Sequence, residues 1–252
     1  MPSRSRLVLR SPLRWLGGLI ALLAIVLTAL AFIGGFFDRD AIHLYGMRKT
    51  SPTRVAAVYY SGDMGLRFGM GTHVAPMLAA RGIPVFGVSM PALFNEQRSQ
   101  AEVNAMLAAT IRDALAQSGA RKIVLMGQSF GSDILVAGLD ALSPELRSKV
   151  AAVVLVVPGQ KAYFRADPTG LRYLEAPDAD EVTAIKRMTW APLICIFGQA
   201  ETDSLCPSLL GSHAKVIEMP GGHFLHNDHD RLVATMLTAL GPIIGQEPEQ
   251  AK

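Results

Sequence analysis

The sequence predicts an α/β fold with a mainly parallel sheet, because short apolar segments alternate with amphipathic segments along most of the chain. Apolar runs without polar alternation are typical of strands that are buried on both faces, as in parallel sheets. Amphipathic segments between such strands are typical of the helices that cover those faces. The chain has 252 residues, which is enough for one such domain with a sizeable core.

The elements can be assigned in chain order from this alternation. Each predicted strand is short and apolar, and turn-favouring residues separate it from the next helix. No internal repeat or low-complexity tract interrupts the pattern. The predicted strands cover residues 55–60, 84–88, 122–126, 152–157, 193–197 and 215–219, and the predicted helices cover residues 70–81, 101–117, 132–142 and 230–240.

An uncharged apolar stretch over residues 15–37 precedes this domain. At helical rise it is long enough to cross a hydrocarbon core of roughly 30 Å. Residues 29–31 have the small-x-small form of a signal peptidase site, so residues 1–37 are either an uncleaved membrane anchor or a cleaved signal segment. The positive-inside rule places the rest of the chain in the periplasm, because unopposed arginines precede the stretch: Arg4, Arg6, Arg10 and Arg14.

The remaining boundaries follow from composition. Residues 38–53 are expected to form a polar connector, residues 54–245 the α/β domain and residues 246–252 a tail. The segment 158–190 is long for a link between strands and contains several prolines and charges. We expect it to form a lid or cap over the carboxyl edge of the sheet.

The net charge gives little support to a nucleic-acid partner. The chain has 24 basic and 21 acidic residues, but four of the basic residues lie in the leader, which leaves 20 against 21. A domain without excess positive charge lacks the electrostatic footprint of nucleic-acid binding.

Residues 127–131 form a G-x-S-x-G motif between a predicted strand and a predicted helix. In α/β-hydrolases this context places the serine on a tight turn, where flanking glycines avoid a clash with neighbouring backbone. The sequence therefore predicts an α/β-hydrolase fold with Ser129 as nucleophile. The alternative is an ordinary loop in which Ser129 only caps the helix.

A serine nucleophile needs a base and an orienting acid, which in this fold follow the last strands in the order Ser, Asp or Glu, His. His223 follows two glycines after the last predicted strand, so it is the expected base. Two residues compete for the acid. Asp203 is preferred because Asp203-Ser204-Leu205-Cys206-Pro207 has the spacing of a D-x-x-V-P turn, and Glu201 is the alternative.

An oxyanion hole needs two backbone N–H groups aimed at the developing negative charge. One is expected from Phe130, the residue after the nucleophile. The other is expected from Asp63, in the glycine-rich loop after the first predicted strand. The alternative for this loop is an ordinary turn.

A metal site is a weaker interpretation. Residues 226–229 look like the H-x-D-H half of a metallo-hydrolase motif, but the first histidine of the full motif is replaced by Phe224. Zinc sites need at least three convergent ligands, and the other histidines lack such spacing. We therefore expect no metal and no organic cofactor.

The chain has two cysteines, Cys195 and Cys206. In an oxidising periplasm they are expected to form a disulfide around the acid loop. The alternative is two buried free thiols.

Taken together, these motifs resemble the VirJ/AcvB family of bacterial periplasmic α/β-hydrolases, from about residue 55 to residue 243. The resemblance implies hydrolysis of an aminoacyl ester of aminoacyl-phosphatidylglycerol at the outer face of the inner membrane, and an association with type IV secretion and virulence. An alternative of another class is a non-catalytic adaptor for secretion components on the same fold. The motifs that carry the resemblance are residues 60–63, 127–133, 195–198, 203–207 and 220–223.

Overall fold

The computed structural model describes residues 12–47, 54–167 and 169–245. Its centre is a seven-stranded sheet in the order β1-β3-β2-β4-β5-β8-β9. Every neighbouring pair is parallel except β1 and β3. The strands are β1 (Ile42–Tyr45), β2 (Val55–Tyr60), β3 (Val85–Val88), β4 (Lys122–Gln128), β5 (Val150–Val156), β8 (Leu193–Gly198) and β9 (Lys215–Met219).

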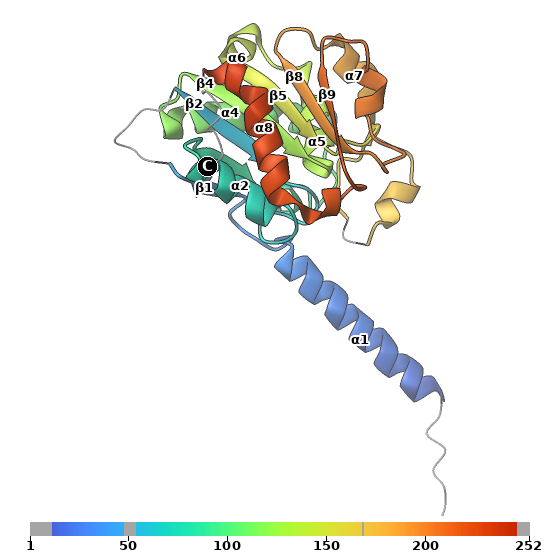
Figure 1. Ribbon diagram of the computed structural model, residues 1–252. Coiled ribbons are helices and arrows are strands. Elements are labelled where there is room, and N and C mark those ends of the chain that lie inside the picture. Colours follow the sequence, from blue (N-terminus) through green and yellow to red (C-terminus); the bar gives the residue numbers. More distant parts are fainter. Residues whose placement is uncertain (1–11, 48–53, 168, 246–252) are drawn as a thin grey trace, which may run out of the picture.

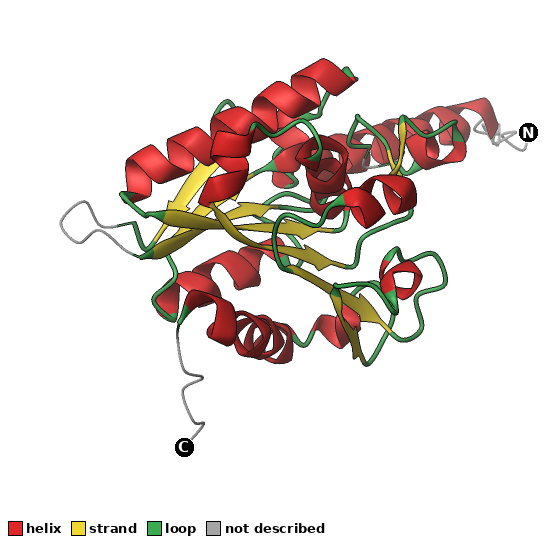
Figure 2. Cartoon of the chain, turned by 90° about the horizontal axis from the view of Figure 1, so that it is seen from above, coloured by secondary structure: helices red, strands yellow, loops and turns green. Residues whose placement is uncertain are grey.

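Helices cover both faces of this sheet, as Figures 1 and 2 show. The side chains of α2 and α8 pack on one face, and those of α4 and α5 pack on the other. Smaller helices complete the second layer. The bounds are α2 (Gly71–Ala80), α3 (Met90–Leu93), α4 (Gln100–Ser118), α5 (Phe130–Leu139), α6 (Pro144–Lys149), α7 (Glu181–Arg187) and α8 (His229–Ile244).

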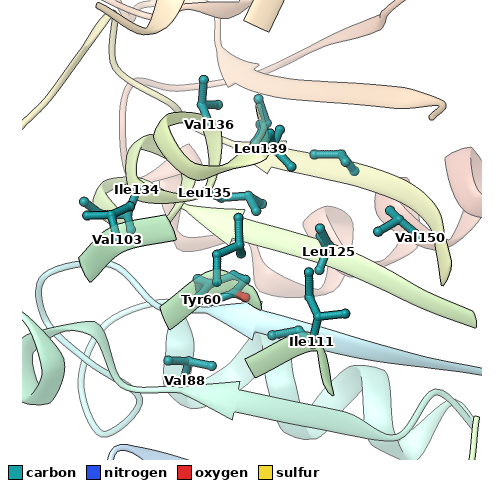
Figure 3. Packing of buried hydrophobic residues seen from close by; sticks show 14 of the residues in the cluster. Tyr60, Val88, Val103, Ile111, Leu125, Ile134, Leu135, Val136, Leu139 and Val150 are labelled. Atoms are coloured by element: carbon teal, nitrogen blue, oxygen red, sulfur yellow. The ribbon is translucent and has the colours of Figure 1, made fainter. Parts of the chain in front are cut away.

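The central strand β4 shows why its sequence is apolar throughout. Its Leu125 packs against α4 and α5, whereas Val124 and Met126 point into the opposite layer. All three side chains are fully buried. Figure 3 shows the first of these cores, where residues of α4 and α5 lie on Leu125 and its neighbours in the adjoining strands. A strand that is covered on both faces does not need polar residues at alternate positions. The resulting unbroken apolar run is the pattern that predicted β4.

All six predicted strands and all four predicted helices of the domain are present, with ends that differ by a few residues. The connector prediction for residues 38–53 is wrong in part, because Ile42–Tyr45 form the edge strand β1. This strand pairs antiparallel with β3, with Ile42 opposite Val88. Its four residues alternate too briefly to show a period, and the pairing depends on a strand about forty residues away, so no local signal marks it. Residues 48–53 and the tail 246–252 lie outside the described residues.

The segment 158–190 forms an excursion with its own small sheet, in which β6 (Lys161–Ala162) pairs antiparallel with β7 (Ala179–Asp180). Between them lies the short 3₁₀ helix η1 (Leu171–Leu174). The Arg172 side chain holds this helix in place. It donates to Asp178 at 2.8 Å and to the carbonyl of Ala176 at 3.0 Å, and its guanidinium lies over the Tyr163 ring.

The apolar N-terminal stretch forms helix α1 (Pro12–Ile33), which projects away from the domain (Figure 1). Its residues Trp15–Ile33 have a mean hydropathy of 2.7 and none of them is buried, so this helix is long and apolar enough to cross a membrane. The three residues that follow the helix turn back onto the domain, and Phe36 is buried in the core beneath α3 and α4. The arginines Arg4, Arg6 and Arg10 lie outside the described residues.

The expected disulfide between Cys195 and Cys206 is present, with the two Cα atoms 5.5 Å apart. It links β8 to the 3₁₀ helix η2 (Cys206–Leu209) and closes a loop over a sequence separation of 11. Both sulfur-bearing residues are fully buried in the core. The loop between them therefore has fixed ends.

We predict that loss of this disulfide lowers the thermal stability of the domain. In the chain-entropy view, a closed loop of this size stabilises the folded state by about 3 kcal/mol. For a domain of this size that corresponds to a fall of roughly 6–12 °C in Tm, measured by calorimetry on the double variant Cys195→Ala/Cys206→Ala. Because both side chains are buried, the reduced wild-type chain is the matched control, since it loses only the bond. An unchanged Tm in both samples would contradict the prediction.

Candidate active site

Ser129 lies on the turn between β4 and α5, with a backbone φ of 49° and ψ of −124°. A positive φ is uncommon for a residue with a side chain, and such strain persists only where the surrounding structure enforces it. Here the Ser129 N–H donates to the carbonyl of Val156 in the neighbouring strand at 2.8 Å. The turn therefore presents the hydroxyl above the carboxyl edge of the sheet, as a nucleophile elbow requires.

The two glycines of the motif are sterically required. A Cβ on Gly127 would lie 2.5 Å from the Cα of Ser132, and a Cβ on Gly131 would collide with the carbonyl oxygens of Tyr60 and Ser61. Real Cβ atoms do not approach backbone so closely. Gly127 thus allows α5 to turn back tightly against the end of β4, and Gly131 allows α5 to begin directly against the end of β2.

His223 reaches the serine from the loop after β9. Its Nε2 lies 2.8 Å from the Ser129 Oγ. The loop passes very close to the end of β8, where a Cβ on Gly198 would collide with the carbonyls of Gly221 and Gly222. This close approach of two loops sets the position of the imidazole.

Glu201 holds the other side of the imidazole. Its Oε1 lies 2.6 Å from the His223 Nδ1, and its Oε2 accepts from the Gly198 N–H at 3.2 Å. The carboxylate side chain is only 5% exposed, against 42% for the histidine. A backbone hydrogen bond of 2.9 Å from the Ala200 N–H to the Gly221 carbonyl joins the loops that carry the two residues.

The geometry therefore favours the alternative acid over the preferred one. Asp203 is exposed and makes no hydrogen bond to His223; it lies on the wall of the pocket in front of the serine. The cause is the tight turn at Gly198–Glu201, which points Glu201 back under the imidazole. Two residues after Asp203, the Leu205 N–H donates to the Pro158 carbonyl at 2.9 Å, and this contact directs the chain towards the excursion instead.

The environment of His223 raises its pKa above the ordinary value for histidine. The hydrogen bond to Glu201 is the largest cause, and the charges of Glu201, Asp133 and Asp63 add to it. Burial opposes this effect but is weaker. The imidazolium is thus stabilised in the position where it would form after taking a proton from Ser129.

The two expected oxyanion donors lie on the same pocket. Gly62, which precedes Asp63, lies so close to Ser129 that a Cβ on Gly62 would be 3.7 Å from the Ser129 Cβ. Within the described residues, neither the Phe130 N–H nor the Asp63 N–H donates to a backbone carbonyl. The Ser61 hydroxyl fixes this loop, because it accepts from the Met90 N–H at 3.0 Å and donates to the Gly62 carbonyl at 2.9 Å.

A pocket of about 760 Å³ opens in front of Ser129 and His223. The loop after β2 forms one wall, and the excursion 158–190 forms the other. Its lining combines apolar and acidic side chains with one lysine, and the excursion contributes Lys161, Tyr163 and Tyr173: Met64, Phe68, Met70, Phe130, Tyr163, Tyr173, Phe224, Asp63, Asp133, Asp203 and Lys161.

Three carboxyl groups share this pocket, those of Asp63, Asp133 and Asp203. Burial raises the pKa of Asp133 to about 8, the hydrogen bond from the Gly159 N–H opposes it, and the charges of Asp63 and Asp203 add to the rise. Burial also raises the pKa of Asp63, whose carboxylate accepts from the Tyr173 hydroxyl at 3.1 Å. Three acidic side chains therefore line the pocket beside a single lysine, Lys161.

A fourth acid, Glu181, lies behind this wall at the start of α7. It is fully buried, and neither of its carboxylate oxygens has a hydrogen-bond partner among the described residues. Burial is the main cause that raises its pKa to about 9, and the charge of Asp133 adds to it. No sequence pattern marks Glu181, whereas Asp133 directly follows the G-x-S-x-G-S segment, which could have identified it.

The histidine-rich segment after His223 caps helix α8 and packs against α2. Asp228 caps α8 by accepting from the Arg231 N–H at 3.0 Å, and the His229 ring stacks on that of His73 with centroids 4.3 Å apart. In the part of the chain that the structure describes, no group of three or more His, Cys, Asp or Glu side chains is arranged to hold a metal ion.

Known structures share this architecture at low sequence identity. Est1E from Butyrivibrio proteoclasticus has a TM-score of 0.55 and 11% identity, covering 79% of this chain and 94% of that chain. A serine hydrolase without a lid, XC6422 from Xanthomonas campestris, has a TM-score of 0.52 and 16% identity over 80% and 88%. The esterase Est2 from Thermogutta terrifontis has a TM-score of 0.54 and 16% identity over 84% and 94%.

These similarities show the fold alone. The sequence identities are too low to indicate an activity. No curated protein matches the chain. The sequence does match the family described as bacterial virulence protein (VirJ), over residues 54–242. Because this match includes every strand of the sheet except β1, the chain belongs to the VirJ family and has the α/β-hydrolase fold.

Proposed function

We propose that this protein is a serine ester hydrolase. The observation that carries the proposal is the continuous chain of hydrogen bonds from Ser129 through His223 to Glu201, at the base of an open pocket. A nucleophile within hydrogen-bond reach of a base, itself oriented by a buried acid, is the arrangement that activates a hydroxyl.

The reaction follows from the positions of these groups. The Ser129 Oγ attacks the ester carbonyl carbon while His223 Nε2 accepts its proton, and the negative charge on the carbonyl oxygen is stabilised by the Phe130 and Asp63 N–H groups. His223 then donates the proton to the leaving alcohol, which leaves an acyl-enzyme. Water, deprotonated by the same imidazole, releases the acid and restores the serine. Every step uses side chains and amides of this chain, so the mechanism needs no cofactor.

For the substrate, we propose an aminoacyl ester of a phospholipid such as aminoacyl-phosphatidylglycerol. The lining supports the aminoacyl part, because its three carboxyl groups outnumber its single lysine, Lys161, and this excess of acidic groups favours an ammonium group next to the scissile ester. An ammonium group that binds beside Asp133 would lower the raised pKa of this carboxyl, so its binding would displace a proton.

The proposed location is the periplasmic face of the inner membrane. Helix α1 is long and apolar enough to act as an anchor, and its preceding arginines favour a cytoplasmic N-terminus. A lipid substrate would then lie in the same membrane as the enzyme.

We expect Ser129→Ala to abolish ester hydrolysis without unfolding the domain. The residues of a triad act as a unit, so the loss in kcat should be about a thousandfold or more. The measurement is headgroup release from a panel of aminoacyl phospholipids, with labelling by a fluorophosphonate probe as a second readout. Labelling of the wild type and not of the variant would assign the nucleophile. Wild-type turnover by Ser129→Ala would reject the mechanism, and absence of activity and labelling in the wild type would favour a non-catalytic adaptor for secretion components.

The acid can be assigned with a pair of isosteric variants on a neutral, soluble ester. Glu201→Gln should lower kcat far more than Asp203→Asn, because only Glu201 contacts the imidazole. Loss of the carboxylate also removes the main cause of the raised pKa of His223. Since the base acts when it is neutral, the rising limb of the pH–rate profile should move to lower pH in the residual activity of Glu201→Gln. The opposite ranking of the two variants would return the role to Asp203.

The acidic lining predicts a preference for cationic acyl groups. Asp133→Asn should lower kcat/KM for an aminoacyl ester relative to its N-acetylated neutral counterpart by about tenfold, which corresponds to about 1.4 kcal/mol. The exposed Asp113 on α4, far from the pocket in the fold, provides the matched control Asp113→Asn. An unchanged ratio in Asp133→Asn would show that this carboxylate does not select the substrate.

A further inference from the structure

An apolar rim surrounds the mouth of the pocket. It consists of four side chains that are strongly exposed although they are large and apolar: Phe68 at 47%, Leu171 at 63%, Leu174 at 82% and Phe224 at 64%. Phe68 and Phe224 line the pocket itself, and the two leucines flank Tyr173, which lines it as well. Single exposed apolar residues are common, but a group of them around one opening indicates a contact surface.

The two leucines are held outward by a well-anchored helix. In η1, the buried Arg172 is bonded to Asp178, and the Tyr173 hydroxyl donates to Asp63 across the pocket at 3.1 Å. Arg172 and Tyr173 therefore face inward and are held in place by these hydrogen bonds. Leu171 and Leu174 thus remain exposed in a segment that could not bury them without losing both contacts.

The end of helix α1 packs directly on the loop that forms the other side of the mouth. A Cβ on Gly65 would lie 2.5 Å from the Gly34 carbonyl, and Gly65 belongs to the same loop as Phe68. Asp38, just after α1, pairs with Arg67 of this loop at 3.0 Å. The buried Phe36 fixes the junction to the core.

The anchor and the rim consequently lie on one side of the domain. Figure 1 shows η1 and the loop before α2 on the side towards which α1 runs. Figure 2 shows the same relation from above, with α1 and η1 both beyond the arrowheads of the parallel strands. The carboxyl edge of the sheet, where the pocket opens, is therefore the edge that would face a membrane crossed by α1.

From this arrangement we propose that the apolar rim inserts into the surface of the bilayer that holds α1, so that the pocket opens directly into the lipid headgroup layer. The lipid surface is the occupant because it is continuous with the anchor: α1 holds the rim at a fixed, short distance from it, at high effective concentration. The proposal requires that α1 is retained, and it does not depend on the proposed esterase activity.

The test is the depth of the rim in a membrane, measured on the full chain in phosphatidylglycerol-containing nanodiscs. Single cysteines at Leu171→Cys and Leu174→Cys can be labelled selectively with an environment-sensitive fluorophore, because both native cysteines are buried in the disulfide. The matched control is Leu210→Cys, at a leucine that is 70% exposed in the turn leading to the amino end of β9. A Ser129→Ala background keeps the readout free of any hydrolysis.

Probes at positions 171 and 174 should be quenched several-fold more strongly by a nitroxide on the lipid acyl chain than the probe at 210. They should also be quenched more weakly by aqueous iodide. Equal behaviour at all three positions would overturn the proposal. Shielding from iodide without quenching by the lipid nitroxide would also overturn it, because the rim would then be covered by protein.

Discussion

The imidazole of His223 joins three loops from distant parts of the chain, and the rest of the site depends on the sheet that brings those loops together. Ser129 follows β4 and Glu201 follows β8, while His223 follows β9, the neighbour of β8. Because all three strands are parallel, their carboxyl ends lie at the same edge. The final adjustment is steric, since only a glycine at position 198 lets the histidine loop lie against the end of β8. A larger residue there would push His223 and Glu201 apart without touching either side chain.

The sequence predicted the parts of this arrangement that are local. The strand–serine–helix motif identifies Ser129 from a few neighbouring residues alone, and the short loop after the last strand identifies His223. The choice between Glu201 and Asp203 is not local, because it depends on which way the loop after β8 turns. That direction is set by contacts with Gly221 and with Pro158, which lie about twenty and forty residues away. The same reason applies to β1, whose partner strand β3 lies about forty residues away, and to Glu181, whose burial depends on the tertiary fold.

The electrostatics of the pocket differ from those of the hydrogen-bonded Ser129, His223 and Glu201 beside it. Glu201 is buried but charge-paired, so it stabilises the imidazolium. Asp63 and Asp133 face the pocket, and burial raises the pKa of each. These two carboxyl groups therefore hold their protons more tightly than free carboxyl groups would, and a cation bound beside them would favour release of the protons. A neutral acyl group gains nothing from this exchange, which is why the lining carries information about the substrate and the triad alone does not.

The junction between α1 and the domain determines the direction in which the pocket and Ser129 face. The Gly34–Gly65 contact joins the end of α1 to the loop that carries Asp63, which supplies both an acidic side chain and a proposed oxyanion amide. A flexible tether would leave the pocket free to face any direction. The end of α1 packs on the loop that carries Asp63, and the buried Phe36 fixes this junction. The pocket therefore faces one direction relative to α1. An ester in a lipid headgroup would then reach Ser129 without leaving the membrane surface, and the cost of extracting the acyl chains would not enter the reaction.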